Sequence, residues 1–208
     1  TTKGAKKSFA VVKGKNSQKH LQINIGSNLT NECSWHPATL WVGIGCEMNT
    51  SLSLLERAFE NALIESGLAQ EAVAGLASID LKSNEPALLA LANKRDLPIR
   101  FFKSYELDLV DVPNPSAEVK CAVGTASVSE ASALLGAEKD GILLKQKKIY
   151  RSKDNEEGAV TVAIANSMQP YAPQKGELHL VGSGPGELSY LTSDARCALS
   201  RCAVWIGY

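Results

Sequence analysis

A lysine and a glutamate stand three residues apart in the stretch "SIDLKSNEPALL", directly after a short apolar segment that is predicted to be a strand. Lys82 can bind a carboxylate, and Glu85 can act as a general base on water. In α/β sheets, ligands lie beyond the carboxyl ends of the strands, which is where this pair is expected. The structural alternative is that Glu85 is a charge in the first turn of a helix and Lys82 an exposed loop cation.

A second stretch, "VGTASVSEASALL", places hydroxyl groups at the start of a predicted helix. The hydroxyls of Thr125, Ser127 and Ser129 and the amides after Gly124 can donate hydrogen bonds to an anion or an oxyanion. The alternative is a capping box, in which Ser127 accepts a hydrogen bond from the N3 amide and Glu130 reaches back. Capping alone explains Ser127 and Glu130, but it explains Gly124 and Thr125 less well.

A third stretch, "VGIGCEMNTS", ends a buried strand on glycines. Gly43 and Gly45 let the backbone turn closely, and the helix that follows offers unpaired amides to an anion. The alternative is a glycine turn without a ligand. Cys46 can be a nucleophile or a buried structural thiol, and no histidine follows close by.

The composition is that of an ordinary globular protein and excludes several classes. The 22 basic and 22 acidic side chains cancel, so no positive field favours nucleic acid. No apolar run is long enough to span a membrane. The three histidines are far apart, and we predict no protein-bound metal. The cysteines are odd in number and scattered, which favours a reducing, cytoplasmic location over a disulfide framework; they are Cys33, Cys46, Cys121, Cys197 and Cys202.

Apolar runs and helical periods alternate over residues 40–165 and predict one α/β domain. We expect a three-layer sandwich with a mostly parallel mixed sheet and helices on both faces. Strands are predicted at 40–45, 75–79, 97–102, 141–145 and 159–165, and helices at 52–66, 85–95 and 129–137. A further helical piece begins near residue 115, with Asn114 as its cap and Pro115 in first position.

A polar connection is predicted to join the last two strands. Its basic residues indicate a solvated hairpin or, alternatively, a site for a multiply charged anion. The basic residues of this region are Lys139, Lys145, Lys147, Lys148, Arg151 and Lys153.

The flanking segments differ from the central domain. Residues 1–39 are polar and are predicted to be a linker or the remnant of an upstream domain, with two short strands in "SFAVVKG" and "LQINIG" as the alternative. Residues 166–176 contain two prolines and are predicted to be a second linker. Residues 177–208 indicate the truncated start of another α/β domain, with a strand at 177–181, a glycine turn, a helix at 191–200 and a strand at 203–206.

Three strings together resemble one known family. "WVGIGCEMNTS", "ASIDLKSNEPALLALA" with "LPIRFF", and "VPNPSAEVKCAVGTASVSEASALL" are similar, in order and spacing, to the C-terminal domain of cobalt-precorrin-5A hydrolase, a family of cobalamin biosynthesis. The resemblance covers residues 40–165. It implies a corrinoid or precorrin substrate and the opening of a δ-lactone on the macrocycle with loss of a two-carbon aldehyde. The resemblance does not imply an oligomeric state, and a homodimer is one alternative.

The end of the chain resembles another family of the same pathway. "LVGSGPGELSYLTSDARCALSRCAVWIGY" is similar to the start of a corrin-ring methyltransferase, and its final "GY" favours precorrin-3B C(17)-methyltransferase. The resemblance implies a fused parent protein that uses S-adenosyl-L-methionine. The loop residues implied to bind this cofactor are Gly182, Gly184, Pro185 and Gly186. We do not expect this segment alone to hold the methyl donor, because a strand, a turn and a helix bury too little surface.

Roles on the hydrolase-like domain follow from position and chemistry. Glu85 is the candidate base, Thr125 and Ser127 are candidate donors to the oxyanion, and Lys82 is expected to hold a peripheral carboxylate. Gly43, Gly45, Cys46 and Gly124 complete the predicted substrate-binding set. The alternatives are a non-catalytic corrinoid-binding or hand-over module and a generic nucleotide-binding domain. The latter needs an acidic residue at a strand end about 20 positions after the glycine loop, where Glu65 lies within a predicted helix.

Overall fold

The computed structural model describes residues 24–30, 33–138, 140–153 and 156–172, and positions 181, 182, 191–193, 195, 196 and 199. The chain divides into two compact units, Thr1–Tyr171 and Ala172–Tyr208. Within the described part, no helix has the length and apolar character needed to cross a bilayer.

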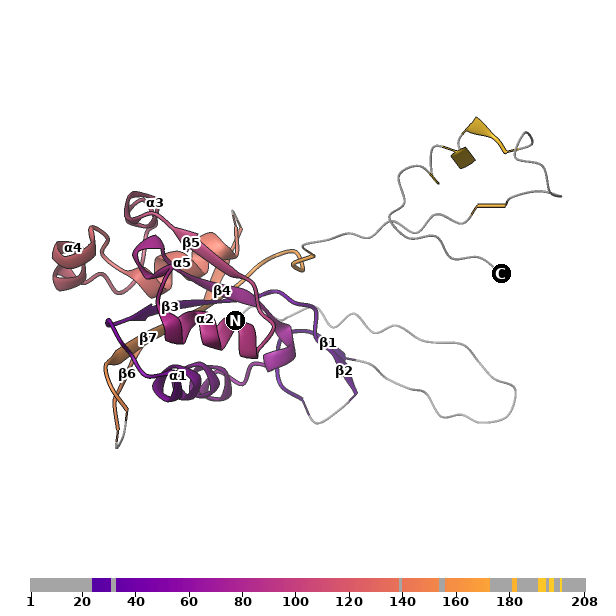
Figure 1. Ribbon diagram of the computed structural model, residues 1–208. Coiled ribbons are helices and arrows are strands. Elements are labelled where there is room, and N and C mark those ends of the chain that lie inside the picture. The colour runs from indigo at the N-terminus through magenta and orange to yellow at the C-terminus, as the bar shows by residue number, and fades with distance from the viewer. Residues whose placement is uncertain are drawn as a thin grey trace. The chain divides into compact units, whose positions relative to one another are not determined.

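A five-stranded mixed sheet forms the middle layer of the first unit (Figure 1). Its strand order is β5-β4-β3-β7-β6. Strands β3, β4 and β5 run parallel, whereas β7 is antiparallel to both of its neighbours. The strands are β3 (Leu40–Cys46), β4 (Val73–Ile79), β5 (Ile99–Phe102), β6 (Ile142–Arg151) and β7 (Ala159–Asn166). The predicted α/β sandwich is confirmed.

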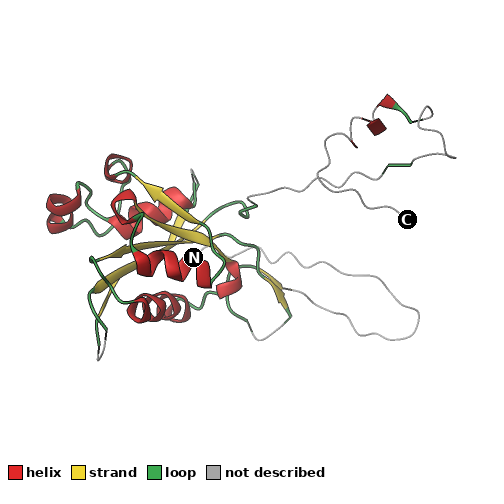
Figure 2. Cartoon of the chain, in the orientation of Figure 1, coloured by secondary structure: helices red, strands yellow, loops and turns green. Residues whose placement is uncertain are grey.

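Helices cover both faces of this sheet (Figure 2). One face packs against α1 and α2, and the other against α3, α4 and α5. Short 3-10 turns, η1 and η2, lie before and after β4. The helical elements are α1 (Leu52–Glu65), η1 (Gln70–Ala72), η2 (Asp80–Lys82), α2 (Pro86–Lys94), α3 (Ser104–Asp108), α4 (Ala117–Val123) and α5 (Val128–Gly136).

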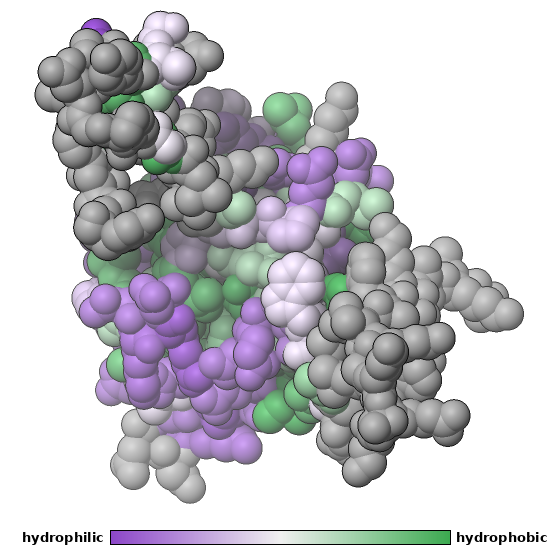
Figure 3. Space-filling model, turned by 90° about the vertical axis from the view of Figure 1, so that its right-hand side faces the viewer, coloured by the Kyte–Doolittle hydropathy of each residue, from purple (hydrophilic) through white to green (hydrophobic). Residues whose placement is uncertain are grey.

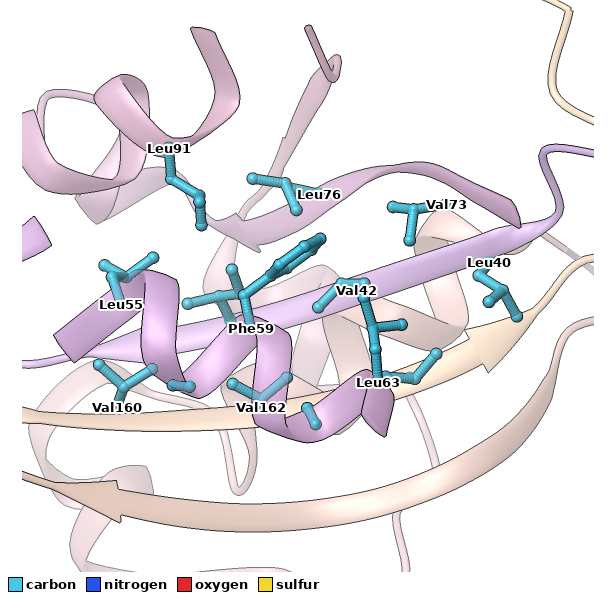
Figure 4. Close-up of a cluster of buried hydrophobic side chains, with 14 of the residues drawn as sticks. Leu40, Val42, Leu55, Phe59, Leu63, Val73, Leu76, Leu91, Val160 and Val162 are labelled. Carbon is cyan, nitrogen blue, oxygen red and sulfur yellow. The ribbon is translucent and has the colours of Figure 1, made fainter. Parts of the chain in front are cut away.

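The α1 face contains the larger core (Figure 4). Leu55, Phe59 and Leu63 recur every four residues along α1, so they form one stripe against the sheet. They meet the aliphatic side chains that β3, β4 and β7 direct to this face, among them Val42 and Val162. Burial of this many large apolar side chains is the main source of stability in the domain.

The α5 face is packed with small residues instead. A Cβ added at Gly43 would overlap the backbone oxygen of Ser129, and it would lie 2.7 Å from the amide nitrogen of Ala133. One at Gly136 would lie 2.9 Å from the Trp41 ring. Helix α5 therefore approaches the sheet through glycines and alanines.

The amino ends of the parallel strands are closed by an aromatic cluster. The Arg100 guanidinium lies 4.2 Å from the Trp41 ring centroid and 5.2 Å from that of Tyr171. The Tyr171 amide donates to the carbonyl of Ala38 at 2.7 Å. Residues after β7, up to Tyr171, are thus held on the first unit.

Figure 3 views the molecule from the side that carries β1 and β2, where hydrophilic areas lie beside smaller hydrophobic ones.

A small separate sheet precedes the main one. β1 (Asn24–Ile25) pairs in parallel with β2 (Ser34–Trp35). The partner of the predicted strand in "LQINIG" is therefore the segment around Trp35. The other predicted strand, in "SFAVVKG", lies outside the described residues.

Between residues 104 and 158 one helix was missed, and the predicted cap at Asn114 and the predicted polar connection are wrong. Helix α3 was not predicted, and α4 is capped by Ser116, whose hydroxyl accepts from the amide of Val119, not by Asn114. The first half of the predicted polar connection is strand, because β6 continues to Arg151. Charged residues are tolerated there because Glu65 accepts hydrogen bonds from Lys145 and Lys148 of this strand at 2.9 and 2.7 Å.

The second unit is described only in part. Within its predicted helix, the amide of Arg196 donates to the Thr192 carbonyl at 3.1 Å, and that of Ala195 to the Thr192 hydroxyl at 3.2 Å. One helical turn begins here. The predicted strands at 177–181 and 203–206 lie almost entirely outside the described residues.

Candidate functional site

The carboxyl ends of the three parallel strands lie level with one another. Gly43 is in register with Ala77, and Ala77 with Arg100. From this register β4 and β5 end two residues further on, at Ile79 and Phe102, and β3 ends three residues further on, at Cys46. Residues that follow any of these strands share one edge of the sheet, as the sequence predicted for Lys82 and Glu85.

Lys82 and Glu85 form a largely buried ion pair at this edge. Lys82 ends η2, and Glu85 is the residue before α2, with Pro86 in first position of the helix. The Lys82 ammonium lies 3.1 Å from Oε2 of Glu85. Glu85 is 8% exposed, and its second oxygen, Oε1, has no hydrogen-bond partner among the described residues. One carboxylate oxygen is therefore held in place by Lys82, while the other is buried without a partner among the described residues.

Cys46 belongs to the same group of side chains. Burial raises the pKa of its thiol to about 11, Lys82 acts in the opposite direction, and Glu85 raises the pKa further. These two charges act on the thiol because the three side chains are close together. At neutral pH the thiol is protonated, which argues against the nucleophilic reading of Cys46.

The two glycines of β3 have a structural explanation. Gly43 is buried beneath α5, and an added Cβ at Gly45 would lie 2.6 Å from the Thr161 hydroxyl. Both positions need glycine because other elements approach the strand closely. A role for Gly43 and Gly45 in substrate binding stays a prediction, and the burial of Gly43 does not favour direct contact.

Gly124 and Thr125 lead into α5 beside the end of β5. Gly124 has a φ of 80°, and an added Cβ would lie 3.5 Å from Ser104, the first residue of α3. Thr125 is fully buried, yet its hydroxyl has no hydrogen-bond partner among the described residues. Capping leaves this hydroxyl unexplained, as the sequence already suggested.

Ser127 does not form the predicted capping box. It is the N-cap of α5, but its hydroxyl makes no cap hydrogen bond. It donates instead to Glu130, with 3.3 Å between the oxygens. Glu130 is fully buried and also accepts from the backbone amides of Asn114 and Lys147 and from the Asn114 side chain. These distant partners hold the carboxylate away from the Ser127 amide.

Ser129, one of the hydroxyl groups predicted at this helix start, was not among the predicted site residues. It is 1% exposed, and its hydroxyl has no partner among the described residues. Three residues later, the Ser132 hydroxyl donates to the carbonyl of Ala77 in β4 at 3.2 Å. Ser129 lies one turn earlier on the same side of α5, and therefore nearer the carboxyl end of β4. The signal for Ser129 in the sequence was a serine in a predicted helix, and the structure buries most residues of that helix.

Other predicted features do not assemble a ligand site. Lys145 and Lys148 are paired with Glu65, and Lys147 donates to the carbonyl of Asn114, which supports the solvated-hairpin reading. Among the described residues, no group of three or more His, Cys, Asp or Glu side chains is arranged to hold a metal ion.

The predicted methyl-donor loop lies largely outside the described residues. Gly184, Pro185 and Gly186 are not described, and an added Cβ at Gly182 would meet no atom within 4 Å. The described part of this loop therefore does not itself provide a cradle for the donor.

Residues 40–165, which carry the whole sheet and its helices, match the family model described as "Cobalamin synthesis G C-terminus". The chain belongs to this family.

Individual relatives agree with this membership. The chain is 31% identical, over 66% of its length, to "Cobalt-precorrin-5A hydrolase" of Priestia megaterium, but it spans only 34% of that protein. It is 34% identical to "Protein CobE" of a Sinorhizobium species, over 53% of this chain and 73% of that protein. A crystal structure of CobE, a protein from the cobalamin (vitamin B12) biosynthetic pathway, matches with a TM-score of 0.55 at 32% identity, covering 63% of this chain and 95% of CobE.

Proposed function

We propose that this chain is the carboxyl-terminal part of a hydrolase of cobalamin biosynthesis that opens the δ-lactone of a precorrin macrocycle. The observation that supports this most strongly is Glu85: a carboxylate 8% exposed, with Oε2 held by Lys82 and Oε1 without a partner, at the carboxyl edge of the sheet. A fixed, partly desolvated carboxylate is suited to general-base catalysis.

In the proposed reaction, Oε1 of Glu85 accepts a proton from water as the water oxygen attacks the lactone carbonyl. The acyl carbon–oxygen bond then breaks, and the leaving oxygen takes the proton from Glu85, which gives a carboxylic acid and a hydroxyl group. The two-carbon aldehyde leaves when the carbon–carbon bond between the hydroxyl-bearing carbon and the ring breaks; the hydroxyl loses its proton, and the ring carbon gains one. Lys82 orients Glu85 through Oε2. Negative charge on the substrate, on the lactone oxygen or on a peripheral carboxylate, is expected to be stabilised by Thr125 and the first amides of α5. Ser127 is a poorer donor because its only O–H already serves Glu130.

The test is Glu85→Gln in the full-length protein. The variant keeps the shape of the side chain but cannot take a proton, so aldehyde release from the lactone should fall by about 10²–10⁴-fold. Glu65→Gln is the matched control, since Glu65 is also paired with lysines but lies at the end of α1. Aldehyde release at the wild-type rate by a folded Glu85→Gln protein would exclude Glu85 as the base.

A second candidate function is a non-catalytic corrinoid-binding or hand-over module. The relation to CobE favours it, because the match spans 95% of the CobE chain and so does not depend on the rest of a hydrolase. Both candidates predict corrinoid binding at the carboxyl edge, but only the first predicts that the lactone is opened and the aldehyde released.

We also propose that the parent protein continues into an S-adenosylmethionine-dependent precorrin-3B C(17)-methyltransferase. The support is the sequence of residues 177–208 alone, with its glycine loop and final "GY". Transfer of a labelled methyl group from the donor to a precorrin by the full-length protein, and not by residues 1–208, is the expected result. The absence of transfer by the full-length protein would refute the fusion proposal. A cytoplasmic place of action is proposed from the scattered cysteines.

A further inference from the structure

The helices of this domain differ in how their amino ends are closed. In α1 the Ser51 hydroxyl accepts a hydrogen bond from the amide of Leu54, and in α4 the Ser116 hydroxyl accepts from that of Val119. Helix α5 also has a serine as N-cap, Ser127, but this serine makes no cap hydrogen bond. The amino end of α5 is therefore left open, although its sequence contains the residues to close it.

Glu130 is the reason. Its Oε1 accepts from the Asn114 side chain at 2.8 Å and from the Lys147 amide at 2.9 Å. Its Oε2 accepts from the Asn114 amide at 3.2 Å and from the Ser127 hydroxyl at 3.3 Å. With four donors, the carboxylate is fully used, and Ser127 is turned toward it. Neither side chain of the expected capping box serves the first amides of the helix.

Two hydroxyl groups beside this open end are themselves without partners. Thr125 is 0% and Ser129 1% exposed, and neither hydroxyl has a hydrogen-bond partner among the described residues. A buried polar group without a partner costs folding free energy. Ser132, one turn further along α5 and equally buried, has two acceptors, the carbonyls of Ala77 and Ser129. The hydroxyls without partners therefore lie only at the amino end of α5, which is at the carboxyl edge of the sheet, as far as the described residues show.

We propose that the amino end of α5, with the hydroxyls of Thr125 and Ser129, binds a carboxylate arm of the macrocyclic substrate. Uncapped amides and the positive end of the helix dipole favour an anion. The two hydroxyls supply neutral donors, and the ammonium of Lys82 lies at the same edge, paired with Glu85. The identification of the carboxylate as part of a macrocycle rests on the proposed function, whereas the anion site itself does not.

The test uses calorimetry to measure how tightly the full-length protein binds a corrin probe. The probe is dicyanocobyrinic acid, a stable corrin with seven free carboxylates, and its heptamethyl ester is the uncharged counterpart. Ser129→Ala and Thr125→Val should each weaken binding of the acid by about tenfold or more, the value expected for a hydrogen bond to a charged group. The ester should bind weakly to the wild type and to both variants alike.

Ser132→Ala is the matched control, and it should behave in the opposite way. Ser129→Ala removes a hydroxyl without a partner, so the midpoint of thermal unfolding should stay the same or rise. Ser132→Ala removes a hydroxyl with two acceptors, so the midpoint should fall while affinity for the acid is unchanged. A fall in stability without loss of affinity in Ser129→Ala would show that the hydroxyl is structural and would overturn the proposal.

Two further results would also overturn it. One is equal affinity of the wild type for the acid and the ester, since the site would then not recognise carboxylates. The other is a Ser129→Ala protein that binds the acid normally but opens the lactone slowly, which would make the site an oxyanion hole. Failure of the hydrolase proposal is separate: a fully active Glu85→Gln protein with impaired binding by Ser129→Ala leaves the carboxylate site intact.

Discussion

Helices α1 and α5 cover opposite faces of one sheet and are built in opposite ways. Helix α1 packs through Leu55, Phe59 and Leu63, and its amino end is closed by Ser51. Helix α5 packs through small residues and contains a buried carboxylate and buried hydroxyls, and its amino end is open. Both helices begin at the carboxyl edge of the sheet, so their position in the fold does not explain why they are built differently.

The difference shows that the α5 side of the domain is stabilised less than the α1 side. Large aliphatic contacts and a closed cap make α1 a structural element. The unpartnered hydroxyls of Thr125 and Ser129 cost folding free energy unless something binds to them, and such local costs are typical of functional sites. The α5 side of the carboxyl edge is therefore where a ligand is expected to contact the domain.

The largest effect is expected where α5 is pressed against the sheet. Gly43→Ala adds a methyl group that overlaps the Ser129 backbone oxygen, so α5 must move. We expect the free energy of unfolding to fall by about 1–3 kcal/mol, as for other overpacked cores. Urea denaturation measures this. Gly26→Ala is the control, because an added Cβ there has no neighbour within 4 Å. Equal stability of both variants would mean that α5 is not closely packed.

A smaller effect is expected from removing the two N-cap serines. Ser51→Ala deletes a cap hydrogen bond of α1 and should cost about 1 kcal/mol of stability. Ser127→Ala deletes no cap bond, only a donor to Glu130, which keeps three others. Hydrogen exchange should therefore distinguish the two variants: Ser51→Ala should speed exchange of the Leu54 amide, whereas Ser127→Ala should leave the first amides of α5 unchanged. If Ser127→Ala sped the exchange of those amides, Ser127 would be a cap and the amino end of α5 would not be open.

The smallest effect concerns the ion pairs that join α1 to β6. Hydrogen bonds from Lys148 and Lys145 hold the pKa of Glu65 at about 2, below its ordinary value of 4.5. Because the folded pKa is lowered, the stabilisation is present above pH 4.5 and is lost as the pH falls toward 2. The carboxylate is partly exposed, so solvent screening limits the contribution to about 0.5–1 kcal/mol.

Glu65→Gln should therefore be slightly less stable than the wild type at pH 7 and equally stable near pH 2. Chemical denaturation across this range is the measurement. A constant difference between the two proteins at every pH would show that the lysines do not act through the charge of Glu65.

Short-range patterns predicted much of this structure. The four-residue spacing of Leu55, Phe59 and Leu63 predicted α1, and parallel strands with level ends placed Lys82 and Glu85 at the carboxyl edge. The predicted end of this helix at residue 66 is also seen: Ser66 is its C-cap, and Gly67 follows with a φ of 62°. Each of these features depends on residues that are close in sequence or on a general rule of α/β sheets.

The errors arose where contacts distant in sequence override a local motif. The "SVSE" sequence is a good capping box, but Asn114 and Lys147, 16 and 17 residues away, take its glutamate. Similarly, the lysines of β6 suggested a loop because their partner, Glu65, lies on α1. The open end of α5 and the unpartnered hydroxyl of Ser129 could not be inferred without these contacts.

The central claim is that the ligand binds at the carboxyl edge, between the Lys82–Glu85 pair and the amino end of α5. Amide chemical shifts of the labelled protein, recorded during titration with dicyanocobyrinic acid, test it directly. The account predicts the largest changes at Gly45, Lys82, Thr125 and Ser129, with little change at the Trp41 indole and at Tyr171, at the other end of the sheet. Large changes at Trp41 and Tyr171, with Lys82 and Ser129 unaffected, would contradict it.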